Sequence, residues 1–163
     1  MRPENRGCPL LELVPHGWSS RRFTIRRDGE TVADLELAWL REGGAVTIGG
    51  EPFELSREGL VSGVFALSRV GIEVVRASKP SAWRERLEVT HEGATYELAK
   101  ASWWGNAYDV RADGRAIGSI RPRHPFTRRS AVTMPEEFPL AVTVFIAALV
   151  VLMWNRQAGA AGG

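Results

Sequence analysis

The segment from Phe138 to Trp154 reads FPLAVTVFIAALVVLMW and contains no charged residue. Its only side-chain hydroxyl is that of Thr143. A helix through this segment would be apolar on every side. Such a helix either spans a membrane or fills the centre of a large core. The segment therefore decides how the rest of the chain is organised.

Residues on both sides of this segment are typical of helix ends. Pro135 suits a first helical position, because the N–H that proline lacks would have no partner there. The two glutamates after it would place negative charge at the positive end of the helix dipole. Arg156 supplies a cation near the other end, and mostly small residues follow. We expect a helix over about residues 135–156 and a disordered tail over 157–163.

The length of the apolar segment weighs against a membrane span without excluding it. Its seventeen residues cover about 25 Å as a helix, whereas the hydrocarbon core of a bilayer is about 30 Å thick. Tilting cannot help a segment that is already short. Two alternatives stay open, a helix buried in a protein core and a C-terminal membrane anchor.

The chain before this helix has the pattern of a β-protein. From Leu10 to Met134, short runs of alternating apolar and polar residues are separated by turn signals, which is typical of strands. Asp28-Gly29, Gly49-Gly50 and Asp113-Gly114 are hairpin turn sequences, because these residues tolerate positive φ. The expected strands are residues 11–13, 22–27, 31–39, 45–48, 52–55, 61–68, 72–77, 86–91, 94–100, 107–111, 115–121 and 128–133.

The strand pattern also repeats along the chain. The aromatic that opens Phe23-x-Ile25 recurs as Phe65 and Tyr108, at offsets of 42 and 43 residues. Each copy is followed by a glycine turn, and each is preceded twelve residues earlier by an apolar-Glu-Leu triplet. Chance reuse of short β-patterns is the alternative explanation. If the repeat is real, it predicts three units of four strands.

Three such units can close into one barrel, and a barrel of that size needs a filling. About twelve strands tilted by about 40° enclose a barrel roughly 24 Å across, and a helix with its side chains is about 10–12 Å wide. The expected fold is therefore mainly β, a closed antiparallel barrel of about twelve strands wrapped around a central C-terminal hydrophobic α-helix. Residues 10–156 would form this single domain after a flexible N-terminus, 1–9.

This order of elements resembles the tubby C-terminal-like superfamily, which includes tubby, the phospholipid scramblases and the plant LURP-one-related proteins. The best matching pieces are the hairpin Tyr108-x-Val-x-x-Asp-Gly-x-x-Ile-Gly and the stretch Met134-Pro-Glu-Glu-Phe-Pro-Leu. The resemblance covers about residues 10–156 and is to bacterial-type members. It implies a binding or scaffold domain, with anionic phospholipid as the first ligand to test. The chain lacks the scramblases' proline-rich arm and cysteine cluster, so scrambling is not implied. No basic residue here matches tubby's phosphoinositide site.

The densest basic stretch is the first candidate site. It reads RPRHPFTRR, and its two prolines predict a loop. Arginine guanidinium groups suit phosphate oxygens, so the stretch could bind an anionic head group. The alternative is a solvated loop whose charges offset Glu136 and Glu137. The candidate residues are Arg121, Arg123, His124, Arg128 and Arg129.

Two further clusters have a functional and a structural interpretation. Trp103 and Trp104 lie between two expected strands and are interface candidates, because an aromatic loop can enter a lipid interface. Packing at a barrel end is their alternative. A second arginine cluster, with Arg22 and Arg26 on the face opposite Phe23, fits an exposed outer wall of the barrel.

Other function classes find little support in the sequence. We identify no nucleophile, acid or base in a catalytic arrangement, so we expect no enzyme and no cofactor. The three histidines are far apart, and Cys8 is the only cysteine, so we expect no metal site. The net charge of +2 is too small to indicate a nucleic-acid partner.

Two hypotheses follow. The first is a non-catalytic binding or scaffold domain, cytoplasmic or peripheral to the membrane, that binds anionic phospholipid or a protein partner. The second is a tail-anchored membrane protein with a cytoplasmic β-domain and a C-terminal transmembrane helix.

Overall fold

The computed structural model describes residues 10–17, 21–38, 40–59, 63–80, 86–124 and 127–162. The expected N-terminal segment 1–9 lies outside this part. The elements are β1 (Leu10–Pro15), β2 (Arg22–Arg27), β3 (Glu30–Ala38), β4 (Gly43–Ile48), β5 (Glu51–Glu58), β6 (Val64–Arg69), β7 (Ile72–Ser78), β8 (Arg86–His91), β9 (Ala94–Lys100), β10 (Tyr108–Ala112), β11 (Arg115–Pro122), β12 (Ser130–Thr133) and α1 (Leu140–Ala161).

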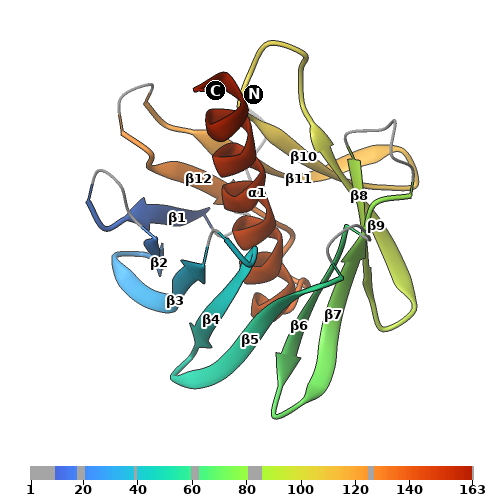
Figure 1. Cartoon of the computed structure of the whole chain (residues 1–163). Coiled ribbons are helices and arrows are strands. Elements are labelled where there is room, and N and C mark those ends of the chain that lie inside the picture. Colours follow the sequence, from blue (N-terminus) through green and yellow to red (C-terminus); the bar gives the residue numbers. More distant parts are fainter. Residues whose placement is uncertain are drawn as a thin grey trace, which may run out of the picture.

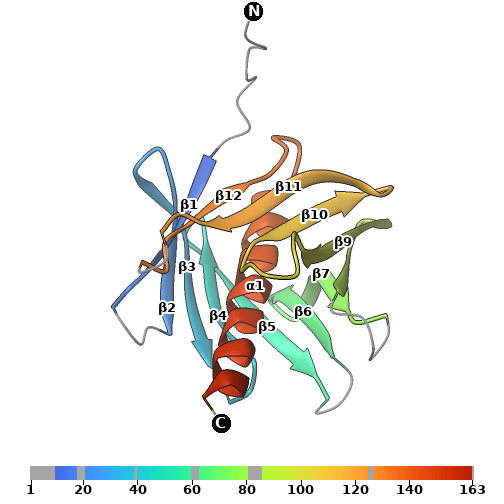
Figure 2. The same ribbon diagram turned by 90° about the horizontal axis from the view of Figure 1, so that it is seen from above.

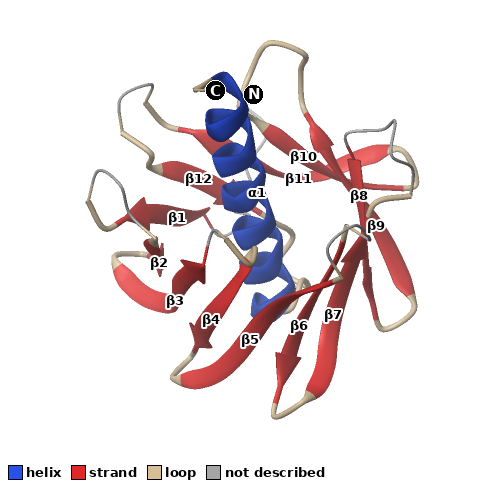
Figure 3. Ribbon diagram, in the orientation of Figure 1, coloured by secondary structure: helices blue, strands red, loops and turns tan. Residues whose placement is uncertain are grey.

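The strands form one closed antiparallel barrel around α1. Each strand pairs with the next along the chain, and β1 pairs with β12 to complete the ring. Figure 1 and Figure 3 show α1 crossing the space that the strands enclose. The expected fold, a mainly β barrel of twelve strands with a C-terminal hydrophobic helix, is confirmed.

The limits of the helix differ from the expected ones. It begins at Leu140 rather than at Pro135, because the residues before it form a turn in which the Phe138 N–H donates to the Pro135 carbonyl at 3.1 Å. Pro139 occupies the N-cap position and disfavours helical geometry at the residue before it. At the other end the helix continues to Ala161, so residues 157–161 are helical.

The core lies between the inner wall of the barrel and α1. Alternate residues of each strand face inward, as Phe23 and Ile25 do on β2, and both are buried. Every helix residue from Val142 to Leu152 is buried. Burying a large apolar side chain contributes about 1.5–3 kcal/mol. The strands therefore supply a wall and the helix supplies the interior that the wall needs.

The sequence repeat is a structural repeat. The pairs β2–β3, β6–β7 and β10–β11 each contain a shift of register, which follows Ile25, Leu67 and Val110 respectively. These positions lie 42 and 43 residues apart, as in the sequence pattern. The closing pair obeys the same rule, because Val132 of β12 lies opposite Leu11 just as Val46 of β4 lies opposite Phe53. Chance does not explain a repeat that extends to bulges and pairing.

The two ends of the barrel differ in their connections. At one end, the turn end, five hairpins close through two-residue turns in which both residues have positive φ. The turns are Asp28-Gly29, Gly49-Gly50, Val70-Gly71, Glu92-Gly93 and Asp113-Gly114. Residues 134–139 also lie at this end and lead into α1. At the other end, the loop end, longer connections surround the C-terminal turns of α1 (Figure 2). Binding sites tend to lie on such loops.

Candidate binding site at the loop end

Charge is divided between the two ends of the barrel. The described loop residues at the loop end carry one carboxylate, Glu42, and the cations Arg21, Arg41, Lys79, Arg123, Arg128 and Arg129. The turn residues and the 134–139 connection at the turn end carry no lysine or arginine and the carboxylates Asp28, Glu92, Asp113, Glu136 and Glu137. Counted over these described connections alone, the loop end is therefore positive and the turn end negative.

The single loop carboxylate is neutralised by two arginines. The Arg156 guanidinium donates to Glu42 through Nε and Nη2, the latter at 2.6 Å, and Arg57 donates to the same carboxylate. The hydrogen bond from Arg156 holds the pKa of Glu42 below its ordinary value, and Arg57 acts in the same direction. Glu42 raises the pKa of Arg156 in return. Glu42 therefore offsets none of the described loop cations, because both of its partners lie in β5 and α1 rather than in the loops.

A cavity of about 270 Å³ opens at this end beside the last turns of α1. Trp154 forms part of its wall and is fixed there, because its indole Nε1–H donates to the Asn106 carbonyl at 2.9 Å. The loop between β11 and β12 forms the opposite wall. The cavity is lined by Phe23, Asn106, Pro122, His124, Thr127, Arg128, Ser130, Val151, Trp154, Asn155 and Ala158.

Ser130 is an unsatisfied polar group in the wall of this cavity. The residue is 1 % exposed, and its hydroxyl has no hydrogen-bond partner among the described residues. A buried polar group without a partner costs about 1–3 kcal/mol. Ser130 is not among the residues predicted from the sequence, although period-two alternation with the buried Val132 indicates an inward side chain at this position. Its hydroxyl is therefore a donor without a described acceptor beside the cavity.

The structure brings two of the five predicted basic residues to the cavity. His124 and Arg128 both line it. Within the described part of the chain, the Arg128 guanidinium makes no hydrogen bond and no ion pair. Arginine presents a planar fork of donors that fits a phosphate oxygen pair. Arg128 is therefore the strongest anion ligand among the predicted residues.

The other three predicted residues have different positions. The Arg121 guanidinium donates to Asp109 at 3.0 Å on the neighbouring strand, so its charge is already paired. The Arg129 Nη1 atom lies 3.8 Å from Oε1 of Glu12, so these two side chains form an ion pair. The Arg123 backbone N–H donates to the Arg129 carbonyl at 2.9 Å, which closes the neck of the loop, and the Arg123 side chain is exposed. These residues are not gathered at the cavity.

The two candidate tryptophans are exposed. Trp103 is 86 % and Trp104 91 % accessible, on the loop between β9 and β10 that also supplies Asn106 to the cavity. The alternative of packing at the barrel end is therefore wrong for this pair. Leu40, also at the loop end, is 99 % exposed. The second arginine cluster lies on the outer wall, as expected. There Nη2 of Arg22 lies 3.4 Å from Oε1 of Glu36.

Within the described residues there is no group of three or more His, Cys, Asp or Glu side chains that could hold a metal ion. The length and composition of α1 are compatible with a membrane span, although most of its apolar residues are buried in the barrel. Comparison with protein-family models, with curated proteins and with solved structures finds no match to this chain.

Proposed function

We propose that this protein is a non-catalytic binding module that docks, loop end first, on an anionic phospholipid membrane. One observation carries the proposal. The exposed Trp103 and Trp104 project from the same end of the barrel as the excess cations of the described loops, while the turns and the 134–139 connection at the opposite end carry carboxylates and no lysine or arginine.

The physics of a membrane surface fits this arrangement. Tryptophan favours the boundary between head groups and acyl chains. Each lysine or arginine close to an anionic surface contributes about 1 kcal/mol of attraction. The carboxylates of the turn end would be repelled by the same surface, so the field would orient the barrel before contact. The docked protein would be peripheral to the cytoplasmic leaflet.

The cavity beside α1 adds a specific contact to this general attraction. A phosphate of a lipid head group would accept hydrogen bonds from the free Arg128 guanidinium and from the Ser130 hydroxyl. Charge-assisted hydrogen bonds of this kind are stronger than neutral ones. The resemblance to the tubby-like superfamily supports the proposal through its order of elements and remains a proposal itself.

Two alternatives lead to different results in the same experiments. An acidic protein surface would engage the same cations, but it would not need the exposed tryptophans. A tail-anchored protein is favoured by the apolar length of α1. In that case the full chain would stay in the membrane fraction at high salt and high pH, whereas a peripherally docked barrel would be released.

Vesicle flotation tests the proposal. Full-length protein is mixed with vesicles of phosphatidylcholine alone or with added phosphatidylserine, at low and at high salt. We expect binding only to the anionic vesicles and loss of binding at high salt. The double variant Arg123→Gln/Arg128→Gln removes two cations worth about 1 kcal/mol each, so the partition coefficient should fall about 30-fold. Trp103→Ser/Trp104→Ser should also weaken binding.

The matched control is Arg111→Gln/Arg115→Gln, which removes two arginines beside the Asp113-Gly114 turn at the opposite end. This variant should bind as the parent protein does. An equal loss of vesicle binding in both arginine variants would mean that only the net charge of the protein matters. Vesicle binding that is unchanged in Trp103→Ser/Trp104→Ser would favour an acidic protein partner. Either result contradicts docking through the loop end.

A further inference from the structure

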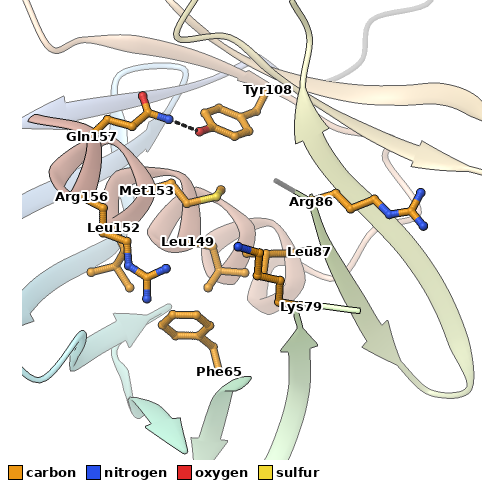
Figure 4. Close-up of a pocket in the computed structure, with 10 residues that line it drawn as sticks. All are labelled: Phe65, Lys79, Arg86, Leu87, Tyr108, Leu149, Leu152, Met153, Arg156 and Gln157. Atoms are coloured by element: carbon orange, nitrogen blue, oxygen red, sulfur yellow. Dashed lines mark hydrogen bonds between the residues drawn. The ribbon is translucent and has the colours of Figure 1, made fainter. Parts of the chain in front are cut away.

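A second cavity, of about 210 Å³, lies on another side of α1 and has an apolar floor. Leu149, Leu152 and Met153 of α1 line it together with Phe65, and Figure 4 shows Leu149 and Leu152 on the side of the Phe65 ring and Met153 nearer to Tyr108. Leu87 and Tyr108 from the barrel wall also border the space. None of these side chains borders the cavity lined by Arg128 and Ser130, so the two sites are separate.

Most polar groups around this cavity are already engaged. The Gln157 side-chain amide donates to the Tyr108 hydroxyl at 3.0 Å. Arg156 is held by Glu42, and its guanidinium carbon lies 5.6 Å from the centroid of the Phe65 ring. Arg86 donates to Glu97 at 2.8 Å, and Figure 4 shows its guanidinium directed away from the cavity.

Lys79 is the exception. Its side chain lines the cavity (Figure 4). Among the residues that the structure describes, it has no hydrogen-bond or ion-pair partner. Lys79 is exposed, so water solvates its ammonium group at the rim of the cavity. A ligand that joins an anion to an apolar body would pair with this cation and cover the apolar floor at the same time.

The size of the cavity limits that ligand. An apolar cavity of about 150 Å³ is enough to hold benzene, so 210 Å³ accommodates a ring and one small polar substituent. We propose that this cavity binds a small organic anion, an aryl carboxylate of about the size of benzoate. Its carboxylate would pair with the Lys79 ammonium, and its ring would lie between Phe65 and the α1 side chains Leu149 and Met153. This site goes beyond membrane docking, because it selects a soluble ligand.

Methionine NMR of the full-length protein tests the site directly. The chain has three methionines. Met153 borders the cavity, whereas Met134 is buried at the turn end and serves as an internal reference. Protein labelled with ¹³C at the methionine methyl groups is titrated with benzoate and with benzamide, a neutral ligand of the same shape. The ring current of a bound ligand should shift the Met153 signal saturably and leave that of Met134 in place.

The charge of Lys79 sets the expected affinities. The carboxylate of benzoate would accept a charge-assisted hydrogen bond from the Lys79 ammonium, which is stronger than the bond to the neutral amide of benzamide. Benzoate should therefore bind roughly tenfold more tightly than benzamide. Lys79→Gln should lower benzoate affinity by about the same factor and leave benzamide affinity unchanged. The matched control is Lys100→Gln, which alters the only other lysine of the chain and should bind benzoate normally.

Three results would overturn the proposal: no saturable shift of Met153, equal affinity for benzoate and benzamide, or equal loss in the two lysine variants. The proposal is separable from membrane docking. Arg123→Gln/Arg128→Gln should keep full benzoate affinity, and Lys79→Gln should lose at most the general attraction of one surface charge in the flotation experiment. Failure of one proposal therefore leaves the other standing.

Discussion

Replacing Ile146 tests whether the barrel and α1 form one cooperative unit. Ile146 lies near the middle of the buried stretch of α1, Val142 to Leu152, and is completely buried. In Ile146→Asp, the new carboxyl group enters an apolar core without a partner. It must either stay charged at a cost of several kcal/mol or take up a proton with a raised pKa. Unfolding free energies of domains are about 5–15 kcal/mol, so the whole protein should unfold or aggregate.

Smaller substitutions of Ile146 show how the loss of stability grows with the size of the void. Ile146→Val should cost about 0.5–1.5 kcal/mol and Ile146→Ala about 2–5 kcal/mol, because each leaves a larger void between helix and wall. Asn155→Asp changes an exposed residue of the same helix and should stay within about 0.5 kcal/mol of the parent protein. Removing everything after Pro139 deletes all the buried helix side chains and should abolish cooperative folding.

Denaturant unfolding, followed by far-UV circular dichroism and by tryptophan fluorescence, measures the series. Both probes should report a single transition, since wall and helix unfold together. A cooperative transition of Ile146→Asp at the parent midpoint would refute this reasoning. So would a well-folded β-domain from the chain that stops after Pro139. Such a result would favour a membrane-anchoring role for the segment.

Three further predictions concern stability. The pKa of Glu42 is lowered in the folded protein, so its ion pairs stabilise the fold above the ordinary carboxyl range. That contribution is lost as the pH falls through the lowered pKa, so the destabilisation by Glu42→Gln in denaturant titrations should be present at pH 7 and shrink in acid. Gly43→Ala should destabilise by about 1–3 kcal/mol in the same assay, because a Cβ there would lie 2.6 Å from the Leu55 carbonyl oxygen; an unchanged midpoint would contradict this. Val70 has a φ of 51°, which is unfavourable for a β-branched residue, so Val70→Asn should raise the unfolding free energy by about 0.5–1 kcal/mol; a lowered thermal midpoint would show that the turn is not strained.

Local sequence patterns predict most of this fold. Alternation places Phe23 and Ile25 on the inner face, and Asp28-Gly29 or Asp113-Gly114 specify two-residue turns, because both signals act between near neighbours. The start of α1 was harder to predict, because Pro135 and Pro139 both suit a helix start. The outcome depends on Pro139, which disfavours helical geometry at Phe138 and becomes the N-cap.

The candidate site was only partly predictable. Arg121 and Arg128 lie in one basic stretch of the sequence. In the fold, Arg121 forms an ion pair with Asp109 on the neighbouring strand, whereas Arg128 lines the cavity. The separation of positive and negative ends needs the topology, since it depends on which connections meet at each end. Ser130 was missed because a single serine in a short strand carries no functional signal, and its importance comes from burial beside α1.

The pairing of β1 with β12 has a consequence for synthesis on the ribosome. The first strand emerges long before its partner, and α1 emerges after every strand. Until then the inward faces of the strands have nothing apolar to cover them, and both edges of the growing sheet are open. Such intermediates invite aggregation, and contacts between distant parts of a chain form slowly. Nascent chains of this protein should therefore depend on chaperones until α1 has left the exit tunnel.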